Sequence, residues 1–73
     1  MAKTSITNKI RMLRFMADEM TQQQLADHVG VTRQTIMAIE AGRYSPSLEV
    51  AFKIARRFDK PLEVVFSYPE FER

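Results

Sequence analysis

The chain has 73 residues, of which 45% are hydrophobic, and carries a formal net charge of +2. This length and apolar content predict one small domain over residues 1–73, and the absence of cysteine excludes a disulfide framework and cysteine metal sites. No apolar run is long enough to span a bilayer and the N-terminus lacks the hydrophobic stretch of a secretory signal, so we expect a cytoplasmic protein without membrane contact.

The first predicted element is an amphipathic helix from about Thr7 to Asp18. Its apolar residues recur at intervals of four, three and four, which places them on one helical face: Ile6, Ile10, Leu13 and Ala17. We expect this face to pack over the elements that follow.

Residues 21–42 predict two short helices joined by a tight turn at Gly30, because glycine readily adopts the left-handed backbone that ends a helix sharply. Thr21 is a candidate N-cap of the first helix, with Gln24 at the spacing of a capping box. Thr32 can cap the second helix, and Gly42 is expected to end it.

The apolar residues of this motif are spaced so that the two helices face each other. The inward positions are Leu25, Ala26, Val29, Val31, Ile36 and Ile39. A small residue where the helices cross allows their backbones to approach closely. This packing leaves the start of the second helix exposed.

Two further helices are predicted after the motif. Ser47 is expected to cap the first, with Glu49 favourably placed in its first turn, and Pro61 to open the second. The apolar residues expected to be buried are Leu48, Ala51, Ile54, Ala55, Phe58, Leu62, Val65 and Phe66. The sequence thus predicts an all-α fold of five helices, with a tail at residues 67–73.

The stretch TQQQLADHVGVTRQTIMAIEAG resembles the helix-turn-helix of the lambda-repressor and Cro-like (Xre) family of bacterial and phage regulators. IRMLRF, AGRYSPSLEVAFKIARRF and PLEVVF are similar to that family's helices one, four and five, so the resemblance covers residues 6–67. It implies a five-helix lambda-repressor-like domain that binds double-stranded DNA as a transcriptional regulator, by default a repressor. With one histidine and no cysteine, the chain is expected to use no cofactor, metal or small-molecule substrate. The chain departs from the family at Asp18, Glu19 and Met20, where many relatives have a glycine.

The recognition helix implied by the resemblance spans residues 32–41. Its outward side chains share one surface, and they match the family's base-contacting positions: Thr32, Arg33, Gln34, Met37 and Ala38. Glutamine can pair bidentately with adenine, arginine can reach guanine or a phosphate, and methionine can lie against a thymine methyl group. The alternative is an ordinary polar helix surface, although Met37 and Ala38 leave it unusually free of charge.

Phosphate contacts are expected on both sides of that helix. Gln22 lies at the positive end of the first motif helix, and Arg43 and Tyr44 follow the recognition helix, where family members grip the other strand. Gln22 has an alternative role within the helix cap. The alternative for Tyr44 is packing over its loop.

Glu40 is the only acidic residue between Asp27 and Glu49, so this stretch repels phosphate little. It falls on the inward side of its helix, where a carboxylate requires a partner. The resemblance implies a structural salt bridge between Glu40 and Arg14 of the first helix. The alternative is an exposed Glu40 that helps to select bases.

Aromatic residues continue past the expected end of the core, at Phe66, Tyr68 and Phe71. Because aromatic residues are favoured at interfaces, we expect a homodimer that reads a near-palindromic site with its recognition helices about 34 Å apart. The alternative for these residues is a tail folded back on its own core.

A second class of function is an antitoxin-like or adaptor module that binds a protein partner through the last helix and the tail. An enzyme is not indicated, because His28 is the sole histidine and the carboxylates form no facing pair. We interpret His28 as a solvent-facing residue or a contact at the DNA edge.

Overall fold

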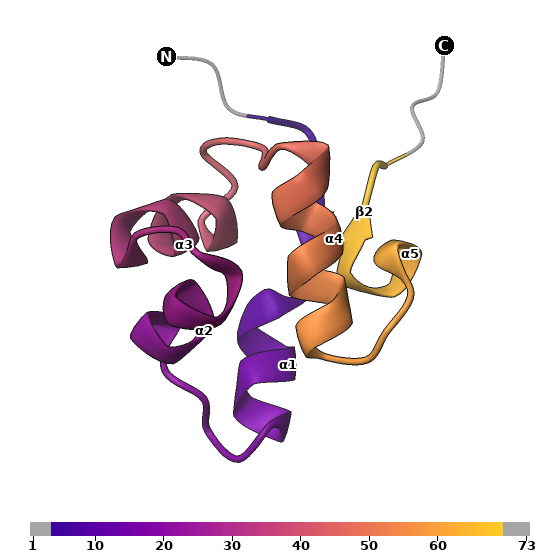
Figure 1. Cartoon of the computed structure of the whole chain (residues 1–73). Helices are drawn as coiled ribbons and strands as arrows, with labels where there is room; N and C mark the ends of the chain where they lie inside the picture. The colour runs from indigo at the N-terminus through magenta and orange to yellow at the C-terminus, as the bar shows by residue number, and fades with distance from the viewer. Residues whose placement is uncertain (1–3, 70–73) are drawn as a thin grey trace, which may run out of the picture.

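The computed structural model describes residues 4–69. The elements in chain order are β1 (Thr7–Asn8), α1 (Ile10–Met16), α2 (Gln22–Val29), α3 (Arg33–Glu40), α4 (Leu48–Arg57), α5 (Leu62–Val65) and β2 (Phe66–Ser67). Figure 1 shows α2 and α3 on one side of the molecule, α5 and β2 on the other, and α4 between them. Within the described residues, the predicted five-helix fold is confirmed and is supplemented by a sheet of two short strands.

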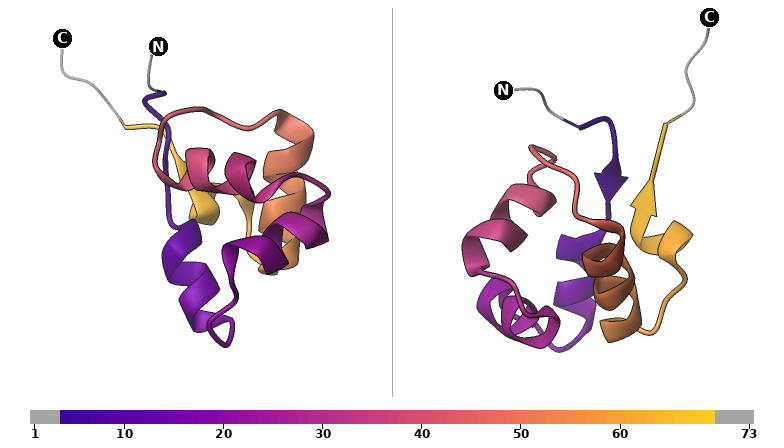
Figure 2. Two further views of the ribbon diagram at one scale, coloured as in Figure 1. Left: turned by 90° about the vertical axis from the view of Figure 1, so that its left-hand side faces the viewer. Right: turned by 45° about the horizontal axis from the view of Figure 1, so that its top comes forward.

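Each of the five helices contributes to the hydrophobic core. Six large side chains are completely or almost completely buried: Ile10, Leu25, Ile36, Ile39, Ile54 and Val65. Burying one such side chain stabilises a fold by about 1.5–3 kcal/mol. The orientation of α3 is therefore fixed by contacts with the other helices, and α2 and α3 lie nearest the viewer in the left panel of Figure 2.

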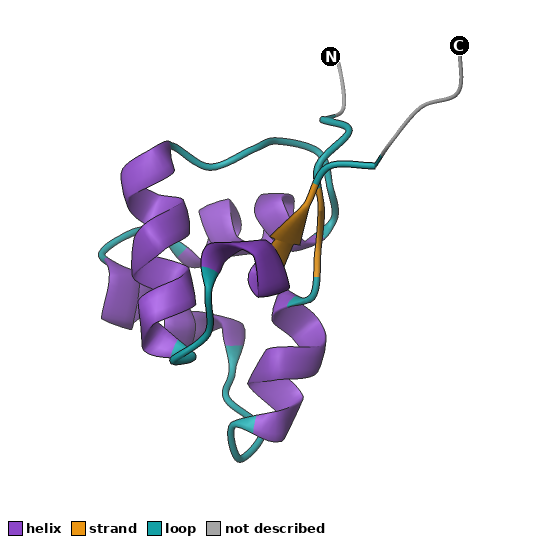
Figure 3. Cartoon of the chain, turned by 90° about the vertical axis from the view of Figure 1, so that its right-hand side faces the viewer, coloured by secondary structure: helices purple, strands orange, loops and turns teal. Residues whose placement is uncertain are grey.

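The start of the chain differs from the predicted helix over Thr7 to Asp18. Thr7 and Asn8 instead form β1, which pairs antiparallel with β2 in the register Thr7 with Ser67 and Asn8 with Phe66. The amide of Lys9 then donates a hydrogen bond to the carbonyl oxygen of Val65 at 2.9 Å. Because these residues are extended to meet β2, α1 begins only at Ile10. The strand pair is visible in the right panel of Figure 2 and, seen from the right-hand side of Figure 1, in Figure 3.

The prediction that Leu48 is buried is wrong, because 68% of this residue is exposed. Leu48 is the first residue of α4 and lies at the edge of the helical face that buries Ala51, Ile54 and Ala55. The apolar spacing alone does not reveal that no other element covers the first turn at this position.

The turn between α1 and α2 adopts left-handed backbone conformations without glycine. Asp18 has a φ of 64° and Glu19 a φ of 58°, each of which is unfavourable for a residue with a side chain. The next residue, Met20, is buried, and its amide donates to the carbonyl oxygen of Arg14 at 2.9 Å. Burial of Met20 and this hydrogen bond offset the backbone strain.

The predicted ends of α2 and α3 are confirmed. Thr21 and Gln24 form a reciprocal capping box at α2, and the side chain of Thr32 accepts a hydrogen bond from the amide of Thr35 at the start of α3. Gly30 has a φ of 79° and Gly42 a φ of 74°, so both use the left-handed conformation that glycine adopts without steric cost. These signals set where α2 ends and where α3 begins and ends.

Candidate nucleic-acid interface

The N-terminal half of α3 is exposed at the positions expected to contact bases. Thr32, Arg33 and Gln34 are exposed, and Met37 is 37% exposed, whereas Ala38 is half-buried. The hydroxyl groups of Thr32 and Thr35 lie 3.0 Å apart, so the Thr32 side chain serves the helix cap. The structure thus brings donor groups and a short apolar surface together at the open end of one helix.

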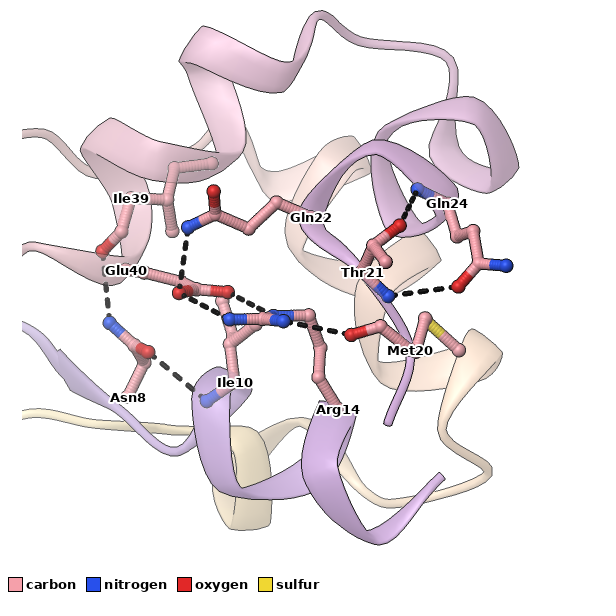
Figure 4. A network of polar contacts seen from close by, with 9 residues as sticks. All are labelled: Asn8, Ile10, Arg14, Met20, Thr21, Gln22, Gln24, Ile39 and Glu40. Atoms are coloured by element: carbon pink, nitrogen blue, oxygen red, sulfur yellow. Dashed lines mark hydrogen bonds and ion pairs between the residues drawn. The ribbon is translucent and has the colours of Figure 1, made fainter. Parts of the chain in front are cut away.

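The C-terminal end of α3 is held in place by a side chain of α1. Nε of Arg14 donates to one carboxylate oxygen of Glu40 at 2.6 Å, and Nη2 donates to the other at 3.1 Å (Figure 4). The side chains of Arg14 and Glu40 are only 16% and 9% exposed. The structure therefore brings the predicted pair together, and the alternative of an exposed Glu40 that selects bases is wrong.

Arg14 also fixes the turn that leads into α2. Its Nη1 donates to the carbonyl oxygen of Met20 at 2.8 Å, so one guanidinium group joins α1, the α1–α2 turn and α3. A bidentate geometry of this kind suits the planar guanidinium group and restricts both partners. The position of α3 is consequently tied to the turn that contains Asp18 and Glu19.

Gln22 lies beside the same ion pair. Its Nε2 donates to the Glu40 carboxylate at 3.2 Å, as Figure 4 shows, while the capping box of α2 is made by Thr21 and Gln24. The side chain is half-buried and keeps its amide oxygen outside this bond. The alternative role of Gln22 in the helix cap is therefore not seen, and its contact with phosphate remains a prediction.

Asn8 contributes a connection that the sequence did not reveal. Its Oδ1 accepts a hydrogen bond from the amide of Ile10 at 3.1 Å, and its Nδ2 donates to the carbonyl oxygen of Ile39 at 2.9 Å (Figure 4). The first bond is local, because an asparagine side chain commonly accepts a hydrogen bond from the backbone amide two residues later. The second bond joins residues 31 positions apart and has no signal in the local sequence.

The residues beyond α3 are open to solvent. Arg43 and Tyr44 are both exposed, and the amide of Arg43 donates to the carbonyl oxygen of Ala38 at 3.1 Å, which helps to end the helix. With Arg33, this places a cation near each end of α3. Because Glu40 is turned inward onto Arg14, the stretch between Asp27 and Glu49 presents no free carboxylate to an approaching phosphate.

The three aromatic residues expected at a dimer interface differ in their surroundings. Phe66 is half-buried and packs against the core, which agrees with the alternative of a tail folded on its own body. Tyr68 is exposed, and Phe71 lies outside the described residues.

Other ligand chemistries find little support in residues 4–69. His28 is exposed near the end of α2, and no group of three or more His, Cys, Asp or Glu residues in that range could hold a metal ion. None of the helices in this range combines the length and apolar character needed to cross a membrane.

Comparison with known proteins agrees with this geometry. A family model for the helix-turn-helix domain matches residues 10–65, from the start of α1 to the end of α5. An HTH-type transcriptional regulator of Methanocaldococcus jannaschii is 48% identical over 65 residues, which cover 89% of this chain and 97% of the relative. The HTH-type transcriptional regulator YgzD of Bacillus subtilis is 48% identical over 59 residues, or 81% of this chain and 88% of the relative.

A phage protein is also similar. The cryptic phage CTXphi transcriptional repressor RstR of Vibrio cholerae is 36% identical over 64 residues, which cover 88% of this chain and 57% of the repressor. The chain therefore belongs to the helix-turn-helix family of lambda-repressor-like (Xre) transcriptional regulators, which are DNA-binding proteins and not enzymes.

Proposed function

We propose that the protein is a sequence-specific repressor that inserts α3 into the major groove of double-stranded DNA and acts as a dimer on an inverted repeat. The observation that carries this proposal is the contrast within α3. Arg33 and Gln34 are exposed at its start, while Glu40 is turned away into an ion pair with Arg14. The groove-facing end can donate hydrogen bonds to bases without a competing negative charge.

Direct base contacts are assigned to Thr32, Arg33, Gln34, Met37 and Ala38. The exposed amide of Gln34 has the donor and acceptor pair that matches adenine, and Arg33 matches guanine or a phosphate. Met37 offers an apolar surface for a thymine methyl group, and Ala38 leaves room for the backbone of α3 to approach the bases.

Backbone contacts are assigned to Gln22, Arg43 and Tyr44. The hydrogen bond to Glu40 orients the Gln22 side chain. It is therefore already held in place to contact a phosphate beside the first amides of α2. Arg43 and Tyr44 follow the other end of α3 and can reach the opposite strand. Such contacts set the register of the helix but carry no sequence information.

Dimerisation is supported by the small size of the module, because one domain of this kind buries only about 600–1,000 Å² on DNA. The proposed interface contains Tyr68 and Phe71, with Phe66 supporting it from the core side. The role as repressor is supported by the name of the similar phage protein, and action on DNA in a prokaryotic cell would place the protein in the cytoplasm.

Selection of bound sequences from random duplexes at stated salt tests the proposal. We expect an enriched inverted repeat. Repetition with Gln34→Ala should relax the preference at one position of each half-site by about 1–3 kcal/mol. Arg43→Ala is the matched control, because it should weaken all sequences alike and reduce the salt slope by about one. Failure to enrich any sequence, even at low salt, would overturn the proposal.

The dimer is tested separately by sedimentation of the free protein. Tyr68→Ser combined with Phe71→Ser should shift the protein toward a monomer while the circular dichroism of the helices remains unchanged. An enriched single half-site, together with a monomer at all concentrations, would contradict the dimer and favour a protein partner for the tail.

A further inference from the structure

The outer face of α1 is apolar and exposed. Met12 is 49% exposed, Phe15 68% and Met16 69%, although all three are large hydrophobic residues on a helix of seven residues. They lie at positions i, i+3 and i+4 and therefore form one continuous surface opposite the buried residues Ile10 and Leu13. A contiguous exposed patch of this kind indicates an interaction surface more often than three scattered apolar residues would.

Opposite charges flank Phe15, one on α1 and the other in the turn that follows it. Arg11 lies four residues before Phe15 and Glu19 four residues after it, and these three residues line one groove together with Arg14 and Met20. The ion pairs found among residues 4–69 are Arg14–Glu40 and Glu49–Lys53, so neither Arg11 nor Glu19 has an ionic partner there. Both residues are exposed.

This arrangement is complementary to itself. If a second α1 packs antiparallel across a two-fold axis near Phe15, Arg11 of each copy meets Glu19 of the other, and the two phenylalanine side chains meet at the centre. If the second helix packed parallel to the first, Arg11 would instead face Arg11 and Glu19 would face Glu19. The charges therefore specify both the identity of the partner and its orientation.

We infer that the α1 face, defined as Arg11, Met12, Phe15, Met16 and Glu19, binds the same face of a second copy of this chain. The contact makes molecules on neighbouring DNA sites bind cooperatively, and this part rests on the function proposed above. It lies on a different element from the tail residues assigned to the dimer, so one molecule can make both contacts.

The size of the face determines when the contact forms. A stable interface buries about 800 Å² on each partner, whereas a helix of seven residues is only about 10 Å long. The contact is therefore weak between free molecules. It becomes effective when DNA holds two copies close together, because the second association is then intramolecular and has a high effective concentration.

The first test measures binding to duplexes that carry the selected sequence once or twice. We expect cooperative binding of about tenfold when the two sites are separated by whole helical turns, about 10.5 base pairs each, and none at half-turn spacings. Phe15→Ser should abolish the cooperativity and leave affinity for the single site unchanged. Phe52→Ser is the matched control, because Phe52 is an exposed aromatic residue on α4 and should leave cooperativity intact. Unchanged cooperativity with Phe15→Ser would overturn the inference.

A charge exchange tests the orientation. Arg11→Glu and Glu19→Arg should each remove most of the cooperativity, because each places like charges together. The double variant Arg11→Glu with Glu19→Arg should restore it. Loss in the double variant, with single-site affinity and helix content preserved, would contradict the antiparallel pairing.

A measurement without DNA separates this inference from the proposed function. Amide resonances of residues 10–19 should shift between micromolar and millimolar protein, and Phe15→Ser should suppress those shifts. If no duplex is bound but the shifts occur, the proposed function fails and the self-contact stands. If duplexes are bound but α1 shows no shift at millimolar protein, the self-contact is wrong.

Discussion

The two ends of α3 are built in opposite ways. At its C-terminal end, Glu40 and the carbonyl group of Ile39 are held by Arg14, Asn8 and Gln22, which come from three other elements. At its N-terminal end, the side-chain hydrogen bonds of Thr32 are local and reach only Thr35. The protein thus fixes one end of the helix with tertiary contacts and leaves the polar side chains at the other end exposed to solvent.

The largest loss of stability is expected from a substitution at the C-terminal end of α3, which tertiary contacts hold in place. Glu40→Ala leaves the half-buried guanidinium group of Arg14 without its carboxylate and should lower the free energy of unfolding by about 2–3 kcal/mol, measured by urea denaturation. Lys53→Ala breaks the exposed pair with Glu49 and should change stability by less than about 0.5 kcal/mol. Equal effects of the two substitutions would show that the network at the end of α3 has no special role.

An intermediate loss of stability is expected from a substitution of Gly30, in the turn that leads into the N-terminal end of α3. Gly30→Ala should destabilise the protein by about 1 kcal/mol, because alanine is unfavourable at a φ of 79°. A Cβ atom added there would meet no atom within 4 Å beyond the neighbouring residues of the chain, so the cost arises from the local backbone conformation and not from the surrounding structure. Gly30→Asn should cost less, since asparagine tolerates this backbone conformation; a larger loss with asparagine in thermal unfolding would contradict this explanation.

The smallest effect on stability is expected at the open end itself. Gln34→Ala removes an exposed side chain that makes no hydrogen bond within the described part of the chain, so the free energy of unfolding should change by less than about 0.5 kcal/mol. The preference among duplex sequences should nevertheless change, as measured by competition binding. A large loss of stability would mean that Gln34 belongs to the fold and not to the interface.

The difference between local and long-range contacts explains which features could be predicted from the sequence. Local backbone chemistry determines the caps at Thr21 and Thr32 and the left-handed conformation of Gly30. Such features can be recognised from the types of a few neighbouring residues. The pairing of Arg14 with Glu40 was implied by the family resemblance. The positions of these residues on their helices were consistent with it.

The contacts that escaped prediction join residues that are far apart in the chain. Two-residue strands are too short to show a periodic pattern, so the pairing of β1 with β2 could not be read from the sequence. The second bond of Asn8, to Ile39, depends on that pairing. The exposed surface of Phe15 was also missed, because apolar spacing identifies the buried face of a helix and does not show what covers the rest.

The pairing of β1 with β2 links the end of the described chain to α3. Phe66 pairs with Asn8, and the side chain of Asn8 holds the Ile39 carbonyl group in α3. A subunit that docks against β2 would thus be connected to α3 through a short, rigid path of backbone and amide bonds. The separation between two half-sites would then be dictated by the folded body, with little tolerance for added or deleted base pairs.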